Sequence, residues 1–270
     1  MFSVVNTIVL RKLCIAGGLA LATGAIAGLL TAQQPPPPQT TPQTAGHVDP
    51  QARQMLDRAI QALGGQAFLS AKSLTTKGRV FFFQDGAVAG LEPFENWALY
   101  PDKRRFSYGK TKPVILINKG NQGWELDQYG LIAQPETQLR GWILSNRYSI
   151  ENLLRLRVND PGVLIQVGQA DFVDNVATEG IEIIATGGTS VRLDLHRQTF
   201  LPYRISYRVR NVNEDAWDDY SDAYADYKMV DGIQTPMHIT RYLNGDRVGE
   251  TFRNFAKYNE DYPPNYFTAE

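Results

Sequence analysis

The three histidines carry the most versatile chemistry at neutral pH, yet their spacing gives them no common site. His47 lies in a proline-rich stretch, whereas His196 and His238 fall in separate segments of the later chain. No two of them stand at the short intervals of a zinc site, and the single cysteine, Cys14, lies far upstream. We therefore interpret His196 as an exposed histidine on the polar face of a strand and expect no metal.

The most acidic stretch is NEDAWDDYSD, residues 213–222. It lacks the central glycine and the terminal bidentate glutamate of an EF-hand loop, so a calcium site is not favoured. The preceding segment 203–210 alternates arginine or serine with tyrosine, isoleucine and valine. In an antiparallel pair, we expect its arginine side to face the side of segment 220–229 that carries Asp222 and Asp226.

Sequence motifs of known enzyme classes are missing from the chain. There is no nucleophile elbow, zinc-protease motif, P-loop or dinucleotide glycine fingerprint, and GGTS at 187–190 is typical of a hairpin. The sequence therefore indicates a non-catalytic protein without a cofactor, with an enzyme of unrecognised type as a remaining alternative. Basic and acidic residues number 27 and 28, without a basic–aromatic cluster, so we expect no nucleic-acid partner.

The elements that must position any site begin with a helix. Asp49 suits its N-cap, Pro50 its first position, and Gly64-Gly65 its end, so we predict a helix over 50–63. From Ser73 the apolar period changes to two, which predicts strands. Residues 135–157 interrupt the strands and are predicted to be helical, with Ser149 as the N-cap of the second piece. The predicted early strands are 74–83, 94–100, 104–108, 114–118 and 123–126.

The clearest turn signal is YLNGDR, because Asn244-Gly245 between strand-like residues is typical of a two-residue type I′ hairpin. That turn pairs Leu243 with Asp246. Continued without interruption, it predicts the further pairs Arg241–Val248, Ile239–Glu250 and Met237–Phe252.

The N-terminal region differs in composition from the rest. Residues 1–32 combine a basic pair, an uncharged Ala/Gly/Leu-rich run and an Ala25-Ile26-Ala27 site, which predicts a secretory signal peptide. The apolar run is also long enough to remain as a membrane anchor, and both alternatives stay open. Residues 33–49 form a Pro-rich linker, and residues 50–270 form one domain.

The order of elements resembles the periplasmic lipoprotein-carrier superfamily, the LolA/LolB-like proteins that sort outer-membrane lipoproteins. The matching segments are the stretch Asp194–Pro202, the pair Asp226-Tyr227, and Val230-Asp231-Gly232-Ile233 followed by Pro236. The resemblance implies a mainly β (α+β) fold: a strongly curved antiparallel half-barrel of about eleven strands, with helices lidding its concave face. It also implies a carrier of lipid or lipoprotein acyl chains that is not an enzyme. Family receptors carry an acylated N-terminal cysteine, which this sequence lacks.

Aromatic and aliphatic side chains crowd the predicted strands, and two interpretations stand beside each other. They either fill a solid core or line a cavity on the concave side of the sheet. On the cavity interpretation, the predicted lining residues are Val80, Phe82, Trp97, Leu99, Phe106, Ile115, Ile117, Trp124, Ile205, Tyr207, Met237, Ile239 and Phe252.

Together these observations predict a monomeric periplasmic protein that shelters acyl chains of lipids or lipoproteins. Segments 50–63 and 135–157 would act as plug or lid, and an inner- or outer-membrane protein would be the transfer partner. The alternative is a sensor or regulatory domain of the same fold, tethered by an uncleaved N-terminal segment and read by a protein partner.

Overall fold

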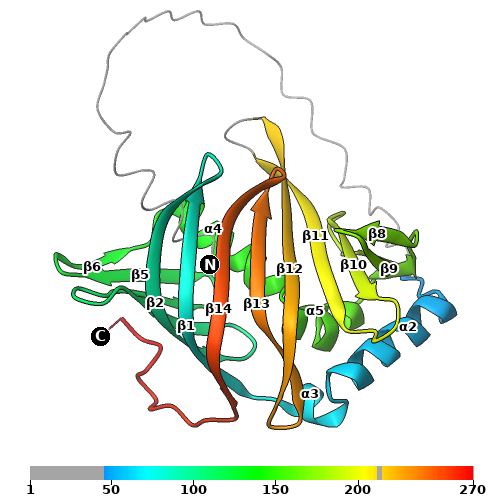
Figure 1. Ribbon diagram of the computed structural model, residues 1–270, viewed down its shortest axis with the longest axis horizontal. Helices are drawn as coiled ribbons and strands as arrows, with labels where there is room; N and C mark the ends of the chain where they lie inside the picture. Colours follow the sequence, from blue (N-terminus) through cyan, green and yellow to red (C-terminus); the bar gives the residue numbers. More distant parts are fainter. Residues whose placement is uncertain (1–45, 212–214, 270) are drawn as a thin grey trace, which may run out of the picture.

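The alternation that begins at Ser73 builds one continuous antiparallel sheet with helices along one face (Figure 1). The computed structural model describes residues 46–211 and 215–269, so the predicted signal peptide and most of the Pro-rich linker lie outside the described residues. The linker's last residues are held, since Val48 bridges Ile165 and Asp49 N–H donates to the Ile165 carbonyl at 2.8 Å.

Two helices and six strands precede the central helical segment. They are α2 (Pro50–Leu63), α3 (Gln66–Ser70), β1 (Ser73–Gln84), β2 (Ala87–Leu99), β3 (Lys103–Tyr108), β4 (Val114–Lys119), β5 (Gln122–Asp127) and β6 (Gly130–Ala133). The predicted caps are confirmed, because the Asp49 carboxylate accepts from the backbone N–H groups of Gln51 and Ala52. Strand β6 was not predicted.

The central segment and the second run of strands complete the chain. They are α4 (Glu136–Arg147), α5 (Ile150–Arg155), a 3₁₀ turn (Arg157–Asn159), β7 (Leu164–Val167), β8 (Asp171–Val173), β9 (Val176–Ile184), β10 (Ser190–His196), β11 (Pro202–Asn211), β12 (Ala216–Val230), β13 (Ile233–Leu243) and β14 (Asp246–Tyr258). The two predicted helical pieces are confirmed, and the Ser149 hydroxyl caps α5 by accepting from Asn152 N–H.

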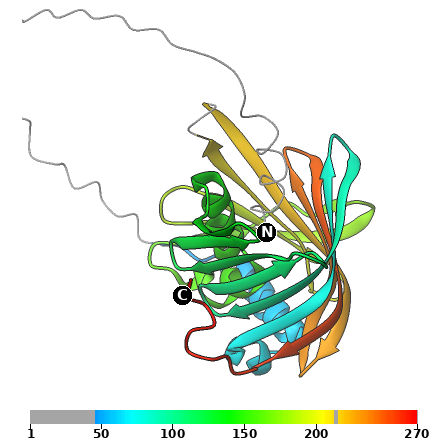
Figure 2. The ribbon, with the colours of Figure 1, turned by 90° about the vertical axis from the view of Figure 1, so that its left-hand side faces the viewer.

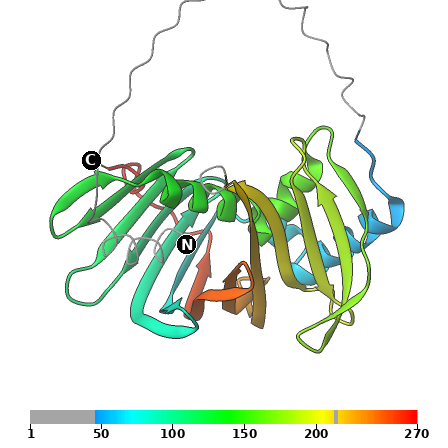
Figure 3. The ribbon, with the colours of Figure 1, turned by 90° about the horizontal axis from the view of Figure 1, so that it is seen from above.

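Strand order follows the chain outward from a central seam. The sheet runs β6-β5-β4-β3-β2-β1-β14-β13-β12-β11-β10-β9-β7, with β8 beside β9. The first and last strands therefore pair in its middle, and the connection between β6 and β7 carries α4 and α5 across one face. The described sheet has fourteen strands, more than the eleven or so expected, and it is curved and open (Figures 2 and 3).

We call the side covered by α4 and α5 the concave face and the other side the outer face; in Figure 1 these helices lie behind the central strands. Two apolar clusters occupy the concave face. The larger joins α2 and α5 to β9–β12 through residues such as Leu56, Leu153 and Leu193. The smaller comprises Val80, Phe82, Phe94, Phe106, Tyr108 and Leu116 on β1–β4.

One bulge changes the register predicted from the Asn244-Gly245 turn. Leu243 pairs with Asp246 as predicted, but Arg241 pairs with Gly249, Ile239 with Thr251 and His238 with Phe252. Val248 is the extra residue, so the three further predicted pairs are wrong by one position. Because side chains alternate between faces, this shift moves Phe252 to the outer face, where its ring stacks on His238 at a centroid distance of 4.1 Å.

The outer face is partly covered by the residues after β14. Tyr266 packs edge-on against Trp97, with ring centroids 5.5 Å apart, and the Thr75 hydroxyl lies 2.8 Å from the Tyr262 hydroxyl. Within the described part of the chain, the helices are too short or too polar to cross a membrane.

Candidate ligand cavity beneath α4 and α5

A cavity of about 150 Å³ lies between the concave face and the two connecting helices. Strands β1, β2 and β3 line one side, β12, β13 and β14 line the other, and α4 and α5 form the cover. The cavity separates the two apolar clusters: Leu74, Ile150 and Tyr224 belong to the larger one, and Phe94 and Phe106 to the smaller. It therefore marks the place where the sheet's curvature exceeds what its side chains fill.

The cover is anchored unequally. Helix α5 buries Ile150, Leu153 and Leu154 in the larger cluster. Helix α4 fully buries one large side chain, Trp142, and packs Leu144 against the edge of the larger cluster. Its other contacts include polar ones, among them Gln138 to the Glu125 carboxylate and Asn146 to the Pro101 carbonyl. Its first turn has no side-chain cap.

Charged side chains give the cavity its chemical character. Arg104 of β3, Arg241 of β13 and Arg253 of β14 line it together with two acidic residues, Asp222 of β12 and Glu151 of α5. The strand pattern explains this convergence. Arg104 and Phe106 are two residues apart on β3, and Arg241 and Ile239 are two residues apart on β13, so each pair lies on the concave face. Charged residues thus stand in the apolar phase of both strands.

The arginines have different partners. Arg241 donates from Nε and Nη2 to the Asp222 carboxylate, both at 2.6 Å, and side-chain exposures are only 10% and 13%. Arg253 donates to the Pro236 carbonyl at 2.9 Å. Arg104 donates to the amide oxygen of Asn118 at 3.2 Å.

Burial shifts the titration of several lining groups. Burial, with repulsion from Arg241, lowers the pKa of Arg104 to about 9. Burial alone would lower the pKa of Arg241 too, but the charge and hydrogen bonds of Asp222 outweigh it and the pKa rises. Burial raises the pKa of Tyr100 and Tyr224 well above the usual value, reinforced by Glu151 at Tyr100 and by Asp222 and Glu151 at Tyr224, so these phenols stay neutral.

These groups are suited to binding a ligand. The described lining residues include no histidine or cysteine. They present guanidinium donors, neutral phenols and aromatic faces, an arrangement that suits a ligand with an anionic and an apolar part.

The predicted lining residues divide between the two faces. Phe106 and Ile239 line the cavity. Val80, Phe82, Ile205 and Tyr207 are buried in the flanking concave clusters. Met237 is buried in β13 but is not a lining residue. By strand register the remaining predicted residues lie on the outer face: Trp97, Leu99, Ile115, Ile117, Trp124 and Phe252.

The set of predicted lining residues did not include the charged ones. The predicted pairing of Asp222 with the arginine side of β11 is wrong, because Arg204 faces Ala223 and Asp222 faces Ile205. An arginine–aspartate pair does join the two strands on the outer face, between Arg208 and Asp219. The sequence did contain a signal: Arg104 and Arg241 each occupy a position on the otherwise apolar face of a strand.

Polar groups outside the cavity have structural partners. His196 Nδ1 accepts from the backbone N–H groups of Gln198 and Thr199, and His238 Nε2 lies 2.9 Å from a Glu250 carboxylate oxygen. Among the described residues no group of three or more potential ligands could hold a metal ion.

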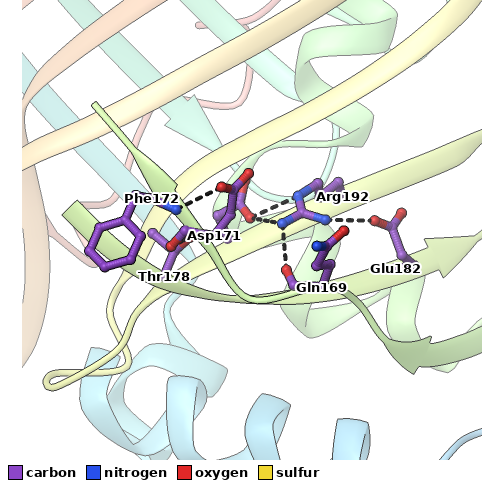
Figure 4. Close-up of polar contacts among 7 residues, drawn as sticks. Gln169, Asp171, Phe172, Thr178, Glu182 and Arg192 are labelled. Carbon is purple, nitrogen blue, oxygen red and sulfur yellow. Dashed lines mark hydrogen bonds and ion pairs between the residues drawn. The ribbon is translucent and has the colours of Figure 1, made fainter. Parts of the chain in front are cut away.

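A second, partly buried ion-pair network lies outside the cavity, around Arg192 of β10. Arg192 contacts the carboxylates of Asp194 and Glu182 and donates to the Gln169 carbonyl at 2.8 Å (Figure 4). A side chain at Gly180 would meet the Arg192 guanidinium at 2.9 Å, so this glycine makes room for it. The network fixes the segment before β8 against the sheet.

Comparison with known proteins identifies the fold. No family model matches the chain, and no curated protein does. Among solved structures, a DUF1329 family protein from Desulfovibrio piger matches with a TM-score of 0.54 at 10% identity, covering 80% of this chain and 96% of that one. A putative outer membrane lipoprotein-sorting protein domain from Vibrio parahaemolyticus matches with a TM-score of 0.50 at 10% identity, covering 80% and 97%.

A LolA superfamily protein from Nitrosomonas europaea is also similar, with a TM-score of 0.48 at 16% identity over 80% of this chain and 97% of that one. At these identities, the first two matches establish the fold and nothing more. The chain shares its fold with the DUF1329 protein and with the lipoprotein-sorting protein domain, and this is the fold that the sequence resemblance predicted.

Proposed function

We propose that the chain is a non-catalytic periplasmic binding protein that shelters acyl chains of lipids or lipoproteins beneath α4 and α5. One observation carries the proposal. The cavity lies beside an apolar cluster on the open half of the concave face, and Phe94 and Phe106 belong to both. An acyl chain that enters the cavity would therefore meet aromatic and aliphatic surface, at about 0.8 kcal/mol for each buried CH₂ group.

The observed cavity is smaller than the roughly 300–1,000 Å³ of typical ligand sites. A long chain therefore requires the cover to move. We assign this movement to α4, because α5 is fixed in the larger cluster whereas α4 inserts one large side chain. No covalent step is needed, since displacement of α4 admits and releases the ligand.

A space of about 250 Å³ next to the cavity supports a route of entry. It lies between α4 and the loops at Asp102 and Asn121, and Trp142 and Asn146 line both spaces. In this proposal Trp142 separates the inner cavity from the entrance, and rotation of α4 would join them.

The test combines ligand detection with control of the lid. Native mass spectrometry after gentle purification should show an acyl-containing ligand, and the stripped protein should bind a fluorescent fatty acid. In a Cys14→Ser background, a short cleavable bismaleimide joining Asp102→Cys to Asn146→Cys should block uptake, and cleavage of the linker should restore it. Each single-cysteine variant treated with the reagent is the control. A protein that carries no lipid and ignores the probe would refute the proposal.

A second candidate function is the binding of a protein partner. A row of aromatic side chains on the outer face favours it. Phe81, His238 and Phe252 are in ring contact there, and Phe252 is 39% exposed. A photoreactive residue at position 252 should give one defined protein adduct in intact cells if this face is read. A photoreactive residue at the exposed position Trp217 is the control.

A further inference from the structure

The cavity contains a half-buried cation, Arg104, whose charge is not matched by a carboxylate among the described residues. Three arginines line it, from β3, β13 and β14, against the two carboxylates of Asp222 and Glu151. Asp222 is engaged by Arg241. Within the described residues, no carboxylate lies within 4.0 Å of Arg104 or Arg253.

Arg104 has the weakest set of partners. It donates one hydrogen bond, to the neutral amide of Asn118, and its guanidinium carbon lies 5.5 Å from the centre of the Phe106 ring. Its Nε is buried, and no acceptor among the described residues reaches it. Arg104 is half-buried, and a guanidinium that loses part of its hydration is ordinarily compensated by a charged partner.

The next residue along the strand provides a comparison. Arg105 points to the outer face, where it donates to the Tyr266 carbonyl and lies over the Tyr266 ring. Its position is explained by packing of the C-terminal segment. No such explanation covers Arg104, whose side chain lies at a cavity large enough for a small group of atoms.

The surroundings of Arg104 define the missing partner. Phe106 and Phe94 stack with ring centroids 5.5 Å apart at the edge of the smaller apolar cluster. The positive charge of Arg104 therefore lies next to an apolar surface. Guanidinium groups pair best with planar or tetrahedral oxyanions, which accept two hydrogen bonds in parallel.

We propose that Arg104 binds the anionic headgroup, a carboxylate or phosphate, of an amphiphile whose acyl chain lies over Phe94 and Phe106. This inference rests on the proposed function and narrows it to charged amphiphiles. The anion fills the donor capacity of Arg104, and Arg253 adds a second cation on the wall formed by β14.

The experiment compares ligands that differ only in the headgroup. The full chain, stripped of lipid, is titrated at pH 7.5 with palmitate and with hexadecanol, using displacement of a neutral fluorescent acyl probe. Palmitate should bind at least about tenfold more tightly, as expected for a charged hydrogen bond. In Arg104→Gln this ratio should fall to about one with hexadecanol binding unchanged, which also shows that the variant is folded. Arg105→Gln is the matched control and should keep the wild-type ratio.

Two further ligands distinguish the sources of the anion. Lysophosphatidate that binds as tightly as palmitate, with the same loss in Arg104→Gln, supports a phosphate headgroup, and weaker binding supports a carboxylate. Inorganic phosphate that binds as tightly as either would overturn the amphiphile inference. So would equal affinities for palmitate and hexadecanol, or a ratio unaffected by Arg104→Gln, while acyl-chain binding itself would stand. Failure of every acyl ligand to bind would remove both proposals.

Discussion

Asp222 and Arg241 face each other across β12 and β13 beneath the lid, and the guanidinium donates two hydrogen bonds of 2.6 Å to the carboxylate. Both side chains are almost fully buried. Asp222→Asn would leave a buried cation without its charge partner, and we expect a loss of about 3–5 kcal/mol in unfolding free energy. Urea denaturation measures it. Asp219→Asn, which breaks the exposed pair with Arg208, should cost under about 1 kcal/mol.

Arg104 should have the opposite effect on stability. Burial lowers its pKa from the usual arginine value to about 9, so below pH 9 the folded state carries a charge that the unfolded chain holds at lower cost. Arg104→Gln removes the charge and keeps a donor for Asn118, and we expect a gain of about 1 kcal/mol at pH 7 in the ligand-free protein. Relative to Arg104→Gln, the wild type should regain stability as the pH rises above about 9, because at this residue the unfolded state then binds more protons than the folded state. A variant less stable than wild type at pH 7 would contradict this.

Ligand affinity should depend on pH with a defined sign. A bound anion raises the pKa of Arg104, so above about pH 9 binding must take up a proton and should weaken as pH increases. Hexadecanol should show no such decline, and in Arg104→Gln the decline for palmitate should disappear. The other titratable groups at the cavity are Tyr100, Glu151, Asp222, Tyr224, Arg241 and Arg253. A palmitate profile that stays flat to pH 10 would contradict the role of Arg104.

Trp142 should control the mobility of α4. It is 2% exposed and is the one large side chain that α4 buries among the described contacts. Trp142→Ala should increase amide hydrogen exchange in α4 by about tenfold or more and speed ligand release, while α5 keeps its protection. Exchange mass spectrometry measures both helices in one experiment. Equal acceleration in α4 and α5 would show that the two helices open together.

The seam between β1 and β14 should tolerate little added volume. A side chain at Gly78 would place Cβ 1.9 Å from the Phe252 carbonyl oxygen, next to an irregularity in the pairing. We expect Gly78→Ala to lower unfolding free energy by about 3 kcal/mol. Gly90→Ala, whose Cβ would meet only the Phe82 ring at 3.3 Å, should cost under about 1 kcal/mol by the same denaturation assay.

Local signals in the sequence predicted most of the elements. The caps at Asp49 and Ser149 and the Asn244-Gly245 turn act through neighbouring residues, and each is found as predicted. The resemblance supplied the curved sheet and its covering helices.

The faces of several strands could not be predicted, because they depend on contacts distant in sequence. The extra residue at Val248 reverses the faces of β14 beyond it, so Phe252 and Thr251 exchange sides relative to the prediction. The face of Trp97 also could not be predicted from its neighbours in sequence, because Tyr266, which covers it, lies far along the chain. Arg104 and Arg241 become meaningful as a site only when β3 and β13 are brought together.

The pairing of β1 with β14 places the first and the last strand of the chain side by side. A chain that emerges from its amino end can form β1–β6 and even position α4, yet half of the cavity wall comes from β12, β13 and β14. The complete cavity therefore forms only after β14 has paired with β1. This pairing joins residues that are far apart in sequence, and such contacts form slowly during folding. A truncated chain would lack half of the cavity wall, so under the proposed function it would bind no lipid.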